Sequence, residues 1–96
     1  MQLTTKQLKF LRAHAHKLKP VVIVGNAGLT DGVHNEIEAS IEHHELIKVR
    51  INASDREERQ SMINKICETA HASLVASIGH IAIIYRPAAK PIIKLP

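Results

Sequence analysis

The chain has 96 residues, and 45% of them are hydrophobic, which is enough for one compact core but not for two. It contains no run of 18 apolar residues, no signal peptide and a single cysteine, so we expect a cytoplasmic protein without a membrane span or an internal disulfide. The net charge of +4 favours a polyanion or an anionic membrane surface as partner and says nothing about the fold.

The first element is predicted to be a basic helix. Thr4 and Gln7 have the spacing of a capping box at its start, and Pro20 must end it at or before Lys19. One apolar stripe recurs at helical spacing and consists of Leu8, Leu11, Ala15 and Leu18.

A strand, a turn and a second helix should follow. Residues 21–24 are continuous and β-branched, which predicts a strand buried on both faces. Residues 25–28, with the sequence Gly-Asn-Ala-Gly, predict a tight turn. Thr30 or Asp31 can then cap a helix that ends near residues 43–45.

A second strand and a third helix come next. Apolar and basic side chains alternate over residues 46–51, so this strand should have one solvent-exposed face that carries Lys48 and Arg50. Ser54 and Glu57 have the spacing of a capping box for the helix that follows.

A hairpin should close the fold. Leu74, Ala76 and Ile78 alternate in a third strand, and the last strand covers residues 81–85. Gly79-His80 between them suits a type II′ turn, because its first residue is glycine.

Together these elements predict an α/β fold of order α-β-α-β-α-β-β. The strand-helix-strand step requires a parallel pair and the hairpin adds an antiparallel pair, so a mixed four-stranded sheet should pack against three helices. We predict one domain over residues 1–87 and an extended tail over residues 88–96, whose prolines disfavour helix.

Charge is distributed unevenly along the chain. Both ends are positive, whereas residues 31–46 carry acids and no Lys or Arg. Residues 1–19 contain no acid, and their cations are Lys6, Lys9, Arg12, Lys17 and Lys19. A molecule with this pattern should present one face to a polyanion and turn another away.

The glycine turn is the segment best suited to bind a phosphate. Its glycines let the backbone bend sharply, so main-chain N–H groups can face a phosphate beside the positive end of a helix dipole. A lone G-x-x-G is also common as a plain structural turn. Asn26 and Ala27 add no charge, and Asp31 competes for the same helix end. The turn therefore needs cations from elsewhere, and the first helix is predicted to supply them.

A longer stretch around this turn resembles a known family. The matching segments are Leu18 to Val22, Val24 to Val33, Glu36-Ile37, His43 to Val49 and Tyr85-Arg86-Pro87. They resemble the signature of the CRM domain, named for chloroplast RNA splicing and ribosome maturation, in its stand-alone bacterial form, the YhbY type. Asn26 and Ala27 depart from the basic residues that many plant members carry in the loop.

The resemblance implies an RNA-binding, KH-like domain with a topology similar to the C-terminal domain of translation initiation factor three. It also implies association with precursors of the large ribosomal subunit, a role in their assembly, and RNA contact through the turn. With the cations above, the expected RNA-binding residues are Gly25, Asn26, Ala27 and Gly28 in the turn and Lys6, Lys9, Arg12, Lys17 and Lys19 before it.

Two other functions are open on the sequence. The acidic second helix could instead dock on ribosomal proteins, through Glu36, Glu38, Glu42 and Glu45. Cys67 and His71 form the only candidate nucleophile–base pair, and they offer two ligands where a structural zinc site needs four. We therefore expect no enzyme, no metal and no cofactor.

Overall fold

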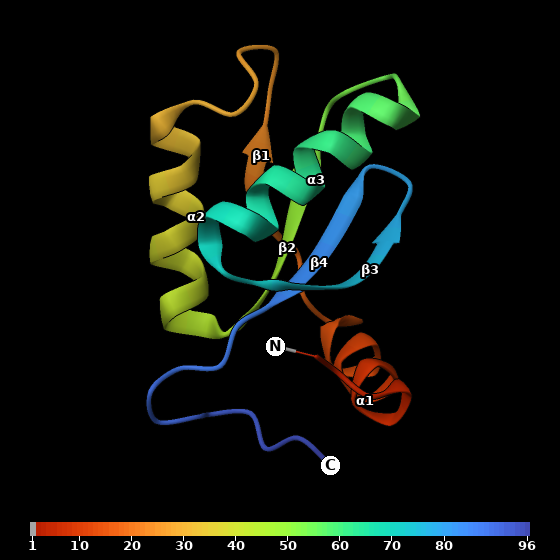
Figure 1. Cartoon of the computed structure of the whole chain (residues 1–96), viewed down its shortest axis with the longest axis vertical. Helices are drawn as coiled ribbons and strands as arrows, with labels where there is room; N and C mark the ends of the chain where they lie inside the picture. The colour runs from red at the N-terminus through yellow and green to blue at the C-terminus, as the bar shows by residue number, and fades with distance from the viewer. Residues whose placement is uncertain (1) are drawn as a thin grey trace.

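Three helices and four strands follow one another in the computed structural model, which describes residues 2–96 (Figure 1). Their bounds are α1 Thr5–Ala15, β1 Pro20–Val24, α2 Asp31–His44, β2 Leu46–Ile51, α3 Arg56–Ala70, β3 Ser73–Ile78 and β4 Ile81–Tyr85. The predicted α/β order is confirmed, and so is the mixed four-stranded sheet. Among the described residues, no helix combines the length and the apolar character needed to cross a membrane.

The sheet has the strand order β1-β2-β4-β3. β1 and β2 run parallel and are joined through α2, whereas β4 pairs antiparallel with both β2 and β3. β2 and β4 therefore form the centre of the sheet, and β1 and β3 are its edges.

Helices cover the two faces of the sheet unequally. α2 and α3 pack on one face, where Ile37 of α2 and Ile66 of α3 meet Val49 of β2 in the larger hydrophobic core. α1 packs on the other face, where Leu11 contributes to a smaller core with Tyr85 of β4. One helix cannot cover a four-stranded sheet, so part of this second face stays open.

The open part includes one side of β1. Val22 and Val24 are buried, but Val21 and Ile23 are 45% and 58% exposed. The prediction of a strand buried on both faces is wrong, because α1 packs on β2, β3 and β4 and leaves this side of β1 uncovered.

The helix starts follow local chemistry. The predicted capping box of α1 is confirmed, with Gln7 N–H donating to Thr4 Oγ1 at 3.1 Å and Thr4 N–H donating to Gln7 Oε1 at 3.0 Å. The predicted cap of α3 at Ser54 is wrong. Asp55 is the N-cap and accepts the Glu58 N–H, while Arg59 donates to the Ser54 carbonyl outside the helix.

The hairpin is confirmed, but the pattern of its first strand is not. A bulge between Leu74 and Ala76 shifts the register of β3, so Val75 is buried while Leu74 and Ile78 are exposed. The simple alternation predicted for this strand is therefore wrong, because the bulge inserts one residue into it. Gly79 has a φ of +58°, as the first position of the predicted type II′ turn requires.

The buried carboxylate of Glu45 holds the C-terminal tail. Glu45 lies directly after α2 at a φ of 66° and is fully buried. Its Oε2 accepts the N–H of Ala88 at 2.6 Å, and its Oε1 accepts the N–H groups of Ile92 and Ile93 at 2.9 and 2.8 Å. Burial alone would raise the pKa of this carboxyl, but the three amides outweigh burial and hold the pKa below its ordinary value of 4.5.

The tail is packed against the rest of the chain although residues 88–96 form no helix or strand. Ile93 and Leu95 join the smaller core, and Gln7 Nε2 donates to the Pro96 carbonyl at 3.4 Å. The division of the chain at residue 87 stays a prediction.

Candidate nucleic-acid interface

The glycine turn is closed by one hydrogen bond across its ends. Gly28 N–H donates to the Gly25 carbonyl at 3.0 Å, and Gly28 has a φ of +73°. Asn26 and Ala27 at the tip are exposed, and their N–H groups donate to no group in the described part of the chain. The tip therefore presents free main-chain donors to solvent, as a phosphate contact needs.

The start of α2 is less favourable to an anion. Thr30 caps it, with its Oγ1 accepting the Val33 N–H at 3.2 Å, and Asp31 places a negative charge in the first turn. A phosphate at this end would rely on the turn rather than on the helix dipole. Met62 of α3 lies near the turn, since a Cβ placed at Gly28 would be 3.9 Å from its Cε.

The five cations of residues 1–19 are all exposed, but they do not lie beside the turn. α1 is near the lower end of the molecule in Figure 1, and the turn is at the top. The chain passes from α1 directly into β1 and reaches the turn only at the far end of that strand, roughly 16 Å away for five residues. The prediction that turn and cations form one joint surface is wrong for this reason.

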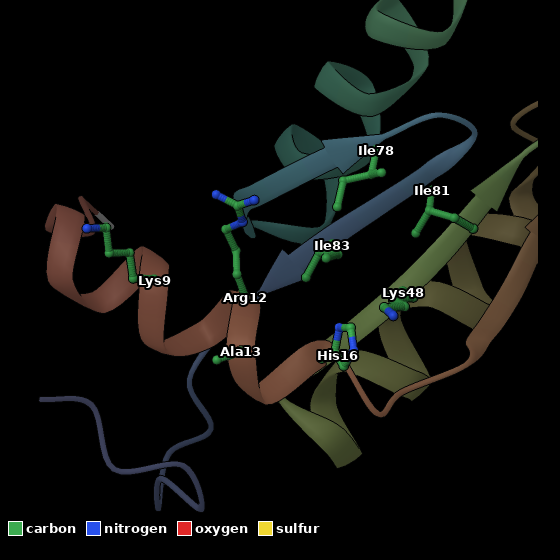
Figure 2. Close-up of a pocket in the computed structure, with 8 residues that line it drawn as sticks. All are labelled: Lys9, Arg12, Ala13, His16, Lys48, Ile78, Ile81 and Ile83. Atoms are coloured by element: carbon green, nitrogen blue, oxygen red, sulfur yellow. The ribbon is translucent and has the colours of Figure 1, made fainter.

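α1 instead forms one wall of an open groove on its own side of the sheet (Figure 2). Lys9, Arg12, Ala13 and His16 recur at one helix face along this wall. Lys48 of β2 lies near His16 and pairs in register with Ile83. The floor is apolar and consists of Ile78, Ile81 and Ile83. The groove has a volume of about 630 Å³, and no described acid lines it.

The predicted cations divide between this groove and other places. Lys9 and Arg12 line the groove, whereas Lys6 and Lys17 are exposed away from it. Lys19 borders a second hollow of about 350 Å³, beside Val21 and Ile93 of the tail. Two of the five predicted cations are thus brought together in one concave site.

From the sequence, Lys48 and Arg50 were predicted only to lie on the solvent-exposed face of a strand, but both belong to the candidate interface. Arg50 pairs in register with Ile23 of β1, one residue before Val24, so it is the cation of the sheet nearest the turn. Its Nε donates to Asn52 Oδ1 at 3.0 Å, and Asn52 N–H donates to the Val24 carbonyl. The signal in the sequence was the pair of cations in the alternating strand, but only the pairing of β2 with β1 shows their places: Arg50 lies near the turn, and Lys48 pairs with Pro20 at the opposite end of β1.

The rival sites have little support. Cys67 is half-buried, and burial raises the pKa of its thiol, so it is a weak nucleophile. Within residues 2–96, no group of three or more His, Cys, Asp or Glu side chains is placed to hold a metal ion.

The acidic helix offers less free charge than its sequence suggests. Glu38 forms a bidentate ion pair with Arg86, with N–O distances of 2.9 and 2.8 Å, and Glu45 is buried under the tail. The Arg86 hydrogen bond holds the pKa of Glu38 below its ordinary value. Of the four glutamates predicted for docking, Glu36 and Glu42 are left on the outer surface without these contacts.

Comparison with known proteins gives one consistent set of similarities. Residues 3–86 match the family model of the CRS1 / YhbY (CRM) domain. The chain is 50% identical over 94 residues to a protein of Haemophilus influenzae named RNA-binding protein, covering 98% of this chain and 95% of that one. It is 42% identical over 91 residues to a probable RNA-binding protein of Pseudomonas aeruginosa, covering 95% and 88%.

The fold is shared with a solved structure. The solution structure of a Staphylococcus aureus protein, described as a candidate RNA-binding protein, matches with a TM-score of 0.85 and 30% identity. The match covers 99% of this chain and 100% of that chain.

Proposed function

The chain belongs to the CRS1 / YhbY (CRM) domain family, and on that premise we propose that it is an RNA-binding protein without catalytic activity. Its relatives in Haemophilus influenzae and Pseudomonas aeruginosa carry names that describe RNA binding. The observation that carries the proposal is the groove beside α1, where three cations surround an apolar floor with no described acid among the lining residues.

RNA would be held at two places. Lys9, Arg12 and Lys48 neutralise phosphates along the groove. At the other end of β1, the free N–H groups of Asn26 and Ala27 bind a phosphate through the main chain, with Arg50 as the nearest cation of the sheet. An RNA that follows the open face of the sheet can reach both places.

The RNA we propose is ribosomal RNA in precursors of the large subunit, within the cytoplasm. Support for naming ribosomal RNA comes from the resemblance to the family rather than from the geometry of the site. Docking on ribosomal proteins is a second possibility with less support, since Glu38 and Glu45 are engaged within the chain. Crosslinking in cells, followed by sequencing of the attached RNA, tests the assignment, and crosslinks spread evenly over cellular RNA would contradict it.

The dependence of affinity on salt tests the groove. If about four to six phosphates are contacted, log K should fall against log salt with a slope of roughly −3 to −4 on single strands. The double variant Lys9→Ala/Arg12→Ala should flatten this slope by roughly 1 to 1.5. Lys65→Ala is the matched control, because Lys65 is an exposed cation on α3 and does not line the groove.

A titration by fluorescence anisotropy at several salt concentrations measures both slopes. A wild-type slope near zero would contradict RNA binding through phosphates. Equal slopes for the double variant and the wild type would remove α1 from the interface.

A further inference from the structure

We propose that the open face of the sheet binds unpaired RNA bases on a row of exposed isoleucines. This isoleucine row consists of Ile23, Ile81 and Ile78, with Arg50 between Ile23 and Ile81. The inference rests on the proposed RNA-binding function and assigns the part of the RNA that this face would contact.

The row crosses the whole sheet in register. Ile23 of β1 pairs with Arg50 of β2, Arg50 pairs with Ile81 of β4, and Ile81 pairs with Ile78 of β3. Residues in register point to the same face. With strands about 4.8 Å apart, three intervals give a row roughly 14 Å long, enough for a few bases.

The row is exposed because α1 does not extend over this part of the sheet. The neighbouring row of the same face includes Ile83, which is buried beneath α1. Ile23 and Ile78 are each 58% exposed, and Ile81 is half-buried on the floor of the groove. Branched aliphatic side chains exposed in line on a sheet are unusual in a chain without a partner, since they leave apolar area in water.

Charge around the row selects the partner. Arg50 lies within it, and Lys9, Arg12 and Lys48 lie along the adjoining groove, which no described acid lines. Protein interfaces are depleted of lysine, whereas a nucleic-acid strand needs cations for its phosphates and apolar or planar contacts for its bases. An arginine guanidinium can also stack on a base.

The bases must be unpaired. In an A-form duplex the base faces are stacked inside and the outer surface offers phosphates and sugars, so a duplex would present no apolar partner to the isoleucines. Neither aromatic residue of the chain can take this role. Tyr85 is buried, and Phe10 stacks on His14 and does not line the groove. We therefore assign the contact with bases to the aliphatic row.

The position of the row also joins the two parts of the proposed interface. One end, at Ile23, is one residue from the end of β1 and the glycine turn that follows. The other end, at Ile81 and Ile78, is the floor of the groove beside Arg12. A single strand can therefore have a phosphate on the turn, bases on the row and later phosphates on α1.

NMR on protein with 13C-labelled isoleucine methyl groups tests the inference directly. The probes are a single-stranded oligouridylate of about ten nucleotides and a duplex RNA of equal length, both long enough to cross the face. The single strand should shift the methyl signals of Ile23, Ile78 and Ile81, and the duplex should not. Ile92 is the internal control, because it is 68% exposed on the tail.

A double variant adds a measurement of affinity. Ile23→Thr/Ile78→Thr keeps β-branched residues at exposed positions, so the fold should persist, as circular dichroism would check. Its affinity for the single strand should fall roughly tenfold while the salt slope and the affinity for the duplex stay unchanged. Ile92→Thr is the matched control and should bind as the wild type does.

The outcomes separate the two proposals. If the wild type binds neither RNA, the proposed function fails. If it binds both but the row methyls do not shift and the double variant binds the strand normally, only this inference is overturned. If RNA does not shift the methyl signals of the row and the double variant no longer co-sediments with ribosome precursors, the row contacts a protein. That outcome also overturns this inference.

Discussion

Glu45 combines a buried charge with a backbone conformation that residues other than glycine rarely adopt. Its φ of 66° and ψ of −44° lie in a sparsely populated region outside the left-handed helical conformation, which costs on the order of 1–3 kcal/mol for a residue with a Cβ. Such strain persists where the surroundings leave no alternative. Here the carboxylate accepts three N–H groups of the tail, and a glycine would leave all three without their acceptor.

Replacing the carboxylate should weaken the fold in a pH-dependent way. Glu45→Gln should lower the free energy of unfolding by about 2–3 kcal/mol near neutral pH, because an amide offers one oxygen where the carboxylate offers two. The folded-state pKa of Glu45 lies below 4.5, so its stabilisation is present above pH 4.5 and is lost as the pH falls through the folded-state pKa. Glu45→Gln should lack this acid-side loss.

Urea unfolding from about pH 7 to about pH 2.5 measures both effects. Glu36→Gln is the control, since Glu36 is exposed on the same helix. If the free energy of unfolding of Glu45→Gln falls with decreasing pH as steeply as that of the wild type, other carboxyl groups cause the loss of stability in acid.

The two glycines of the turn should respond differently to the same substitution. Gly28→Ala forces a Cβ into a φ of +73°, which should lower the free energy of unfolding by about 1–2 kcal/mol. Gly25→Ala should change stability little, because Gly25 has no positive φ and no atom lies within 4 Å of a Cβ placed there. Thermal unfolding of the two variants measures the difference, and equal losses would contradict a conformational role for Gly28.

At the scale of elements, local chemistry predicted the helices well. The capping box at Thr4 and Gln7, the apolar stripe of α1 and the proline after it all act within one segment, so the sequence alone identifies the helix. The exposure of Ile23 and Ile78 could not be predicted in the same way. It depends on where α1 packs and on the bulge of β3, and both are set by tertiary contacts.

The tail and Glu45 should act as one unit. Removal of residues 88–96 exposes part of the smaller core and leaves the buried carboxylate without its donors, so it should lower the free energy of unfolding by at least about 2 kcal/mol. In the shortened chain, Glu45→Gln should no longer destabilise, because its partners are already absent. A double-mutant cycle by urea unfolding measures this coupling, and simple additivity would contradict it.

At the scale of the whole molecule, the candidate site is longer than the sequence suggests. The structure has a turn at residues 25–28 and exposed cations before it, as predicted, but the two do not lie together, because β1 separates them. The resemblance indicated the class of ligand, whereas the contribution of Lys48 and Arg50 emerged only with the strand order.

This length makes a prediction about RNA size. The longest dimension of the molecule is 37 Å, and a stacked strand advances about 3.4 Å per nucleotide, so roughly ten nucleotides span it. Affinity should rise with oligonucleotide length up to about that size and then level off. Titrations with a graded series of single strands measure this, and a tetranucleotide that binds as tightly as a dodecamer would contradict a site that extends from α1 to the turn.

The hydrogen bond between Gln7 and Pro96 has a consequence for engineering. It brings the beginning of α1 close to Pro96, so a short flexible linker can join the start of α1 to the tail. A circular permutant opened between Asn26 and Ala27 would then keep the groove and every strand while cutting the turn in two. Such a chain would separate phosphate binding by the main chain of the turn from RNA binding by the rest of the surface, without changing a single side chain.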